Sequence, residues 1–224
     1  MRSYSTAIKS ILFSILLFAS APSAATLILD HGFSDTTTAS GSSDLGSGNI
    51  KAEDFSLASS ASLGSISWLG IYHGTNTPGN DNFNIGIFTD IGGLPDSSNR
   101  ILNLNPGNAV NRASTNSQTG TASIFSYRAD LATELPLLAN TTYWLSIVNT
   151  FGTTTSNDWA WAASTTGGTA AFITLGDSTP TWAATNGTFQ FQLNTTPVPI
   201  PAALWLFASG LLGLVGFRKK KTIS

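Results

Sequence analysis

The sequence predicts an all-β protein, built as a jelly-roll-like antiparallel β-sandwich. Apolar and polar residues alternate in many short runs, with the period of two that is typical of a half-buried strand. Clusters of Gly, Pro, Asn, Asp and Ser separate these runs and indicate turns. Between residues 26 and 196 no stretch shows the spacing of an amphipathic helix. Many short strands joined by such turns favour a sandwich.

The first 25 residues have the layout of a secretory signal peptide. Arg2 and Lys9 make the start of the chain positive, and the apolar stretch 11–19 is too short to span a membrane. Small residues then precede a cleavage site after Ala25. We therefore expect residues 1–25 to direct export through the Sec machinery and the mature chain to begin at Thr26.

The strands of the exported domain, residues 26–196, are expected where the alternation is clearest. Phe189, Phe191 and Leu193, for example, alternate with glutamines. Residues 90–96 (DIGGLPD) predict a turn, because Gly supplies positive φ and Pro fixes its own φ. We expect about nine or ten strands among the segments 27–30, 52–58, 63–72, 82–89, 101–104, 108–112, 122–128, 142–149, 158–163, 170–175 and 188–193.

Residues 197–224 form a tail of three parts, namely a proline motif (197–201), an uncharged segment (202–217) and a basic cluster (218–221). The uncharged segment would make about 24 Å of helix, against roughly 30 Å for a hydrocarbon core. We expect a single, marginal transmembrane helix whose basic flank stays in the cytoplasm. On physical grounds alone, the segment could equally be a plain C-terminal anchor.

This tail resembles the PEP-CTERM sorting signal of Gram-negative bacteria. The proline motif, LWLF (204–207), SGLLG (209–213) and RKKK (218–221) follow the order of that family. An apolar Ile200 stands where the family has its name-giving Glu. The resemblance implies processing by a membrane protease of the exosortase type. The sorting motif that it implies consists of Val198, Pro199, Ile200, Pro201, Arg218, Lys219, Lys220 and Lys221.

A second resemblance concerns the exported domain. Residues 81–95 and 138–147 look like an exported sandwich domain that often precedes such tails. The similarity covers most of residues 50–194. It implies a fold and a cellular setting, but no activity.

The exported region is acidic and carries few charges. Four basic residues and all twelve acidic residues of the chain lie between 26 and 196, which gives a formal net charge of about −8. Such a region lacks the basic patch that binds nucleic acid, so no nucleic-acid partner is expected. The chain contains no cysteine, which excludes thiol catalysis and cysteine zinc sites.

Residue types that could perform catalysis do not form a recognised motif. His31 and His73 have no metal-ligand spacing, and we interpret both as loop histidines without a role. No Gly-x-Ser-x-Gly sequence is present. Glu53 and Asp54 could supply the carboxylate pair of a glycosidase, or Asp54 could simply begin a strand.

Two sets of residues leave a choice between binding and structure. The loop residues Asp81, Asp90 and Asp96, together with Asn80 and Asn82, could bind calcium through their oxygens, or they could simply form turns. The tryptophans could lie on the surface and bind glycan, or they could be buried in the core; they are Trp144, Trp159, Trp161 and Trp182. We favour the structural alternative in both cases and expect no catalytic residue, metal or cofactor.

These observations predict a non-enzymatic, exported protein that is anchored transiently in the inner membrane by its tail. The exosortase-type protease would then release it to the cell surface or to the exopolysaccharide matrix of a biofilm. A structural or adhesive role is the first hypothesis. A glycan-binding module of the exopolysaccharide is the second, and an enzyme acting on polysaccharide is the third.

Overall fold

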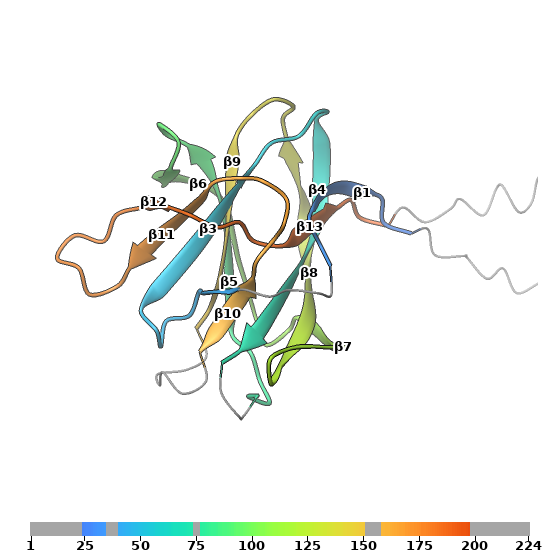
Figure 1. Ribbon diagram of the computed structural model, residues 1–224. Helices are drawn as coiled ribbons and strands as arrows, with labels where there is room; N and C mark the ends of the chain where they lie inside the picture. Colours follow the sequence, from blue (N-terminus) through green and yellow to red (C-terminus); the bar gives the residue numbers. More distant parts are fainter. Residues whose placement is uncertain (1–23, 35–39, 74–76, 151–157, 198–224) are drawn as a thin grey trace, which may run out of the picture. The chain divides into compact units, whose positions relative to one another are not determined.

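The computed structural model describes residues 24–34, 40–73, 77–150 and 158–197. These residues form two antiparallel β-sheets and no helix (Figure 1). The prediction of an all-β fold with two antiparallel sheets is confirmed. The expected signal peptide, the transmembrane helix and the sorting motif fall outside the described residues. Within the described residues, no helix is both long and apolar enough to cross a membrane.

The first sheet has seven strands, arranged around the long strand β4. One edge of β4 pairs with β8, and the other edge pairs first with β13 and then with β10. The outer strands β1, β2 and β7 pair with β13, β10 and β8. The seven strands are β1 (Leu27–His31), β2 (Ser40–Ser42), β4 (Ala61–Tyr72), β7 (Asn111–Thr119), β8 (Ala122–Leu137), β10 (Trp159–Ala162) and β13 (Phe191–Asn194).

The second sheet has six strands in the order β12-β11-β3-β9-β5-β6. The chain repeatedly crosses between the sheets, for example from β3 to β4, from β8 to β9 and from β12 to β13. The six strands are β3 (Asn49–Phe55), β5 (Phe83–Asp90), β6 (Pro95–Gly107), β9 (Tyr143–Asn149), β11 (Ala170–Thr174) and β12 (Ala183–Thr185).

The observed strands agree best with the predicted segments in the two apolar strands β5 and β9, which pair with each other. The expected segments 82–89 and 142–149 correspond to β5 and β9. The expected segment 52–58 was placed too late, because β3 begins at Asn49, where its pairing with β11 begins. Strands β6 and β8 extend well beyond the expected 101–104 and 122–128. Strands β2 and β12 were missed altogether, since three small or polar residues show no alternation.

One core lies between the sheets and is centred on aromatic side chains. Trp68 stacks on Tyr127 with ring centroids 5.5 Å apart, and Phe83 meets Trp68 edge-on at 5.2 Å. Trp159 packs against Phe83 at 5.0 Å. Gly70 makes room for it, because a Cβ there would lie 2.4 Å from the Trp159 ring. Aromatic pairs at such distances add about 0.5–1.5 kcal/mol each beyond their burial.

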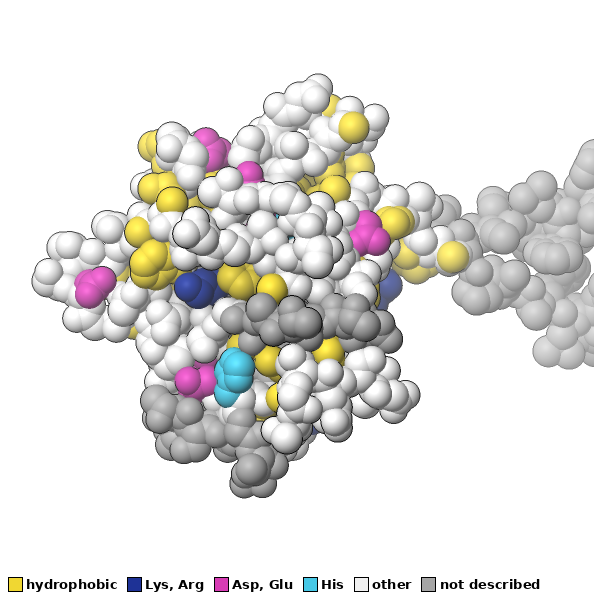
Figure 2. Space-filling view, viewed as in Figure 1, with side chains coloured by type: hydrophobic (Ala, Val, Ile, Leu, Met, Phe, Trp, Pro, Cys, Tyr) yellow, Lys and Arg dark blue, Asp and Glu magenta, His cyan; other side chains and the backbone are white. Residues whose placement is uncertain are grey.

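Every described strand lies within one compact unit, Ala25–Thr196. The core residues therefore come from this unit alone. In Figure 2 the charged side chains of the visible face are few and stand apart from one another, with neutral polar groups between them. The low charge of residues 26–196 is thus visible on this surface.

Candidate functional site

The outer face of the six-stranded sheet carries a small apolar cluster of its own. Side chains alternate along β5, so Phe83, Ile85 and Ile87 face the core while Asn84 and Phe88 face outward. Phe88 packs there with Trp144 of β9, and Trp182 covers them from the chain just before β12. An outer sheet face of an isolated sandwich is normally polar. The chain covers this cluster with Trp182, and Phe88 and Trp144 are 8% and 1% exposed.

A shallow groove of about 170 Å³ lies on this face. Its walls combine aromatic, aliphatic and polar side chains from β3, β5, β6, β9 and β11. The lining consists of Ile50, Asn84, Phe88, Ser97, Arg100, Ser146, Val148, Ile173 and Trp182. A hollow with apolar walls and a few polar groups is the usual form of a small-ligand site.

Three hydrogen bonds and one aromatic ring fix the position of the Arg100 side chain in the groove. It lies opposite Phe88 in the β5–β6 register, and its guanidinium sits 5.4 Å from the centre of that ring. Nε donates to the carbonyl of Leu102 (2.9 Å), while Nη2 donates to the Asn84 Oδ1 (2.7 Å) and to the carbonyl of Ile85 (2.9 Å). These bonds hold the side chain flat on the sheet.

Gly86 makes this conformation possible. A Cβ at that position would lie 2.8 Å from Arg100 Nε and 2.8 Å from Phe88 Cε2. Real side chains essentially never approach so closely, so any larger residue would push the guanidinium away from the sheet. The absence of a side chain at Gly86 therefore shapes the floor of the groove.

The charge of Arg100 is not balanced within the described part of the chain. The other two arginines described there each pair with a carboxylate, Arg112 with Asp81 at 3.0 Å and Arg128 with Asp130 at 2.7 Å. Arg100 forms no such pair among these residues, and its Nη1 donates to none of them. Burial lowers the pKa of Arg100, because it removes water from the charged group.

Trp182 supplies the second aromatic wall. Its ring meets Phe88 edge-on with centroids 5.9 Å apart. Of the four tryptophans singled out in the sequence, it is the one that reaches the groove. Trp159 and Trp161 are completely buried and Trp144 nearly so, at 0, 0 and 1% exposure. An exposed pair formed by Trp159 and Trp161 is therefore excluded, and the core interpretation holds for these residues.

The three aspartates considered as calcium ligands each interact with different neighbours. Asp81 is buried against Arg112 and the Tyr72 hydroxyl. Asp90 accepts from the Gly93 amide (3.2 Å), and Asp96 accepts from the Ser98 amide (2.9 Å), as turn-forming aspartates do. In the described ranges no three His, Asp or Glu side chains form a group that could hold a metal ion.

His31 is not a loop residue as we expected, because it ends strand β1 and is buried. Its Nδ1 donates to the carbonyl of Phe189 (3.0 Å), and its ring stacks on Phe191 at 4.9 Å. Its Nε2 lies 3.7 Å from the Glu53 Oε1. His73 follows β4, and its amide donates to the carbonyl of Asp158 (2.9 Å).

Glu53 is fully buried, so its carboxyl group cannot face a polysaccharide across a cleft. Burial, and then the charge of Asp54, raise its pKa from 4.5 to about 9, so the group is neutral at pH 7. Oε2 accepts from the Phe189 amide (3.1 Å), whereas Oε1 has no hydrogen-bond partner within the described residues. Asp54 accepts from the Thr169 amide (2.5 Å). Neither residue fits the carboxylate pair considered in the sequence.

Sequence reasoning missed Arg100, Asn84 and Phe88. The sequence offered one signal for Arg100, namely the scarcity of basic residues between 26 and 196. Each of these four residues could have been examined for a carboxylate that neutralises its charge. A scan against protein-family models and a search of curated proteins both give no match to this chain.

Proposed function

We propose that this chain is an exported adhesive component of a bacterial cell surface or exopolysaccharide matrix. Its signal peptide would engage the Sec machinery, and its tail would hold it in the inner membrane until an exosortase-type protease releases it. The resemblance of residues 197–224 to the PEP-CTERM signal supports this route. The repeated crossing of the chain between the two sheets supports a jelly-roll arrangement of the exported domain.

We further propose that the sandwich adheres by binding glycan in the groove on the six-stranded sheet. The observation that carries this proposal is the combination of Phe88, Trp182, Arg100 and Asn84 around one hollow. The negative face of an aromatic ring attracts the C–H groups of a sugar ring. Arginine and asparagine supply the donors and acceptors that hydroxyl groups require.

A glycan array probed with the full chain in detergent tests the binding proposal. We expect Trp182→Ala to abolish array binding, because it removes one aromatic wall. The matched control is Phe172→Ala on β11, an aromatic residue outside the groove. Binding that survives Trp182→Ala, or that is lost equally in the control, contradicts the groove as the site.

Mass spectrometry of the surface fraction in the native host tests the sorting proposal. We expect the surface form to lack residues 202–224. Replacing Pro199 and Pro201 with Ala should leave the uncleaved chain in the inner membrane, because prolines keep the segment before the helix extended. Peptides from Phe217 onward in surface material, unchanged by these replacements, would leave only a plain anchor.

A further inference from the structure

We infer that the groove selects glycans that carry a carboxylate group, that is, sugars of the uronic acid class. This inference rests on the proposed function and names the ligand of the same site. It starts from the unbalanced charge of Arg100, which lies in a region with four basic and twelve acidic residues. Lys51 likewise has no carboxylate partner among the described residues, but its ammonium lies over the Phe172 ring and does not line the groove, whereas Arg100 does.

The unpaired charge is costly in this position. Arg100 is half-buried between Phe88 and its hydrogen-bond partners, so it has lost part of its water shell. A desolvated charge is stabilised by an opposite charge and hydrogen bonds. The free chain does not provide that charge within its described residues, so a bound anion would supply it.

The unused donors of Arg100 determine where the anion binds. A guanidinium has five N–H donors in a rigid fork. Nε and Nη2 use three of them on Leu102, Asn84 and Ile85, and the two hydrogens of Nη1 remain. Because the other bonds already fix the plane of the fork, a carboxylate can bind Nη1 with little further loss of side-chain freedom.

The dimensions and walls of the groove favour a sugar acid over other anions. At about 170 Å³ the groove is smaller than the roughly 300–1,000 Å³ of drug-sized sites, so it suits a single ring. Trp182 offers apolar surface for the ring, next to the Arg100 guanidinium for its carboxylate, and Phe88, which is 8% exposed, supports both side chains from beneath. A nucleic acid would need several cations for its phosphates.

The test compares acidic and neutral forms of one ligand. The probes are oligomers of galacturonate, glucuronate, mannuronate and guluronate, each paired with its methyl ester, and dextran sulfate serves as a general polyanion. Binding to the full chain in detergent is measured by calorimetry. We expect at least one acid to bind at least tenfold more tightly than its ester, and Arg100→Met to remove this preference.

Arg128→Ala is the matched control, because it removes an equal charge outside the groove. It should retain the preference for the acid. Equal binding of acids and esters, binding of neutral glycans only, or binding of dextran sulfate alone would each overturn the inference. A preference lost equally in Arg128→Ala would overturn it as well. Neutral binding that requires Trp182 would leave the proposed function intact, whereas no binding to any glycan would overturn both.

Discussion

Arg112 and Arg100 lie on edge strands of the two sheets, β7 and β6, in similar settings that differ in charge balance. Each guanidinium lies 5.4 Å from the centre of a phenylalanine ring, Phe125 for Arg112 and Phe88 for Arg100. Each also donates to backbone carbonyls. The difference is the counter-ion, because Arg112 contacts Asp81 at 3.0 Å and Arg100 has no carboxylate among the described residues. In the proposal above, the paired arginine stabilises the fold and the unpaired one binds a ligand.

The polar groups around Arg112 form hydrogen bonds with one another. Asp81 accepts from the Tyr72 hydroxyl, which in turn accepts from the Asn149 Nδ2 at 2.7 Å. Arg112 also donates to the carbonyls of Pro78 (3.0 Å) and Gly79 (3.3 Å), which ties the segment before β5 to β7. Burial raises the pKa of Asp81, while Tyr72 and Arg112 oppose that rise. This network holds an irregular segment onto the sandwich.

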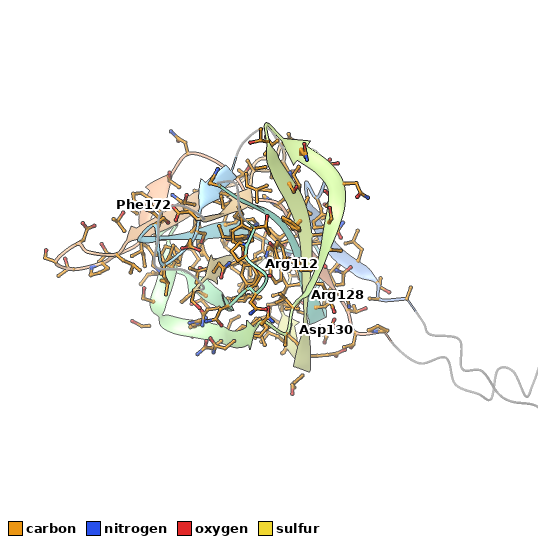
Figure 3. All side chains as sticks on the ribbon, turned by 90° about the horizontal axis from the view of Figure 1, so that it is seen from below. Arg112, Arg128, Asp130 and Phe172 are labelled. Carbon is orange, nitrogen blue, oxygen red and sulfur yellow. The ribbon has the colours of Figure 1, made fainter. Side chains whose placement is uncertain are left out.

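Among the arginine substitutions, the largest loss of stability is expected when the paired arginine is removed. Arg112→Ala leaves Asp81 buried without its cation, which in other proteins costs about 3–5 kcal/mol. Urea unfolding of the full chain in detergent measures the loss. The control is Arg128→Ala, since Arg128 and Asp130 form a more exposed pair on β8 (Figure 3). We expect about 1 kcal/mol or less there. Equal losses in the two variants would contradict a structural role specific to Arg112.

Glu53, like Arg100, is an ionisable residue whose partners in the described chain are incomplete. It is fully buried, and its Oε1 has no hydrogen-bond partner within the described residues. Its pKa is about 9 in the folded chain and 4.5 in the unfolded chain, so only the folded state keeps the proton between these values. The stability is therefore greatest below about pH 4.5 and falls as the pH rises toward about 9, by up to about 1.4 kcal/mol per pH unit.

Glu53→Gln should remove this part of the pH dependence and raise the melting temperature at pH 8, because the amide stays neutral. Thermal melts of both forms between pH 5 and pH 9 provide the measurement. His31 and Asp54, which lie close to Glu53, are unchanged in the variant. A variant as pH-sensitive as the wild type would show that Glu53 is not neutral in the folded chain.

Gly86→Ala tests whether the floor of the groove positions Arg100. The added Cβ would collide with the guanidinium and the Phe88 ring, and overpacking of this kind typically costs about 1–3 kcal/mol. We expect a loss near the lower limit, together with loss of the preference for acidic glycans. Gly167→Ala is the control, because it has open space around its Cα and a φ outside the left-handed region. Retained selectivity in Gly86→Ala would mean that Arg100 does not need this conformation.

The smallest effect on stability is expected for Arg100→Met. The methionine keeps apolar contact with Phe88 and removes a half-buried charge that has no carboxylate partner among the described residues. We expect a change within about 1 kcal/mol in the urea experiment, well below that of Arg112→Ala. A loss as large as that of Arg112→Ala would show that both arginines are structural and that the comparison fails.

The class of the fold and the strands with clear alternation can be predicted from the residues alone. Residues 83–90 and 143–149 alternate in sequence and form strands β5 and β9, although β9 is buried on both faces, and Asp90 to Asp96 carry the residues that a turn needs. These features are local, because one strand and one turn are specified by neighbouring residues. The tail and the signal peptide are likewise local patterns, and their roles remain predictions.

Only the tertiary structure decided which residues meet across the sheets. Arg100 lies beside Phe88 because β5 and β6 pair in one register, and Trp182 reaches them from a chain segment more than eighty residues away. Pairing with β5 extended β6 through the polar residues 96–99, and pairing with β4 extended β8 as far as Leu137. Glu53 and His31 came together from β3 and β1 in a similar way. Such contacts depend on register and on strand order, and neither is specified by any single segment of the chain.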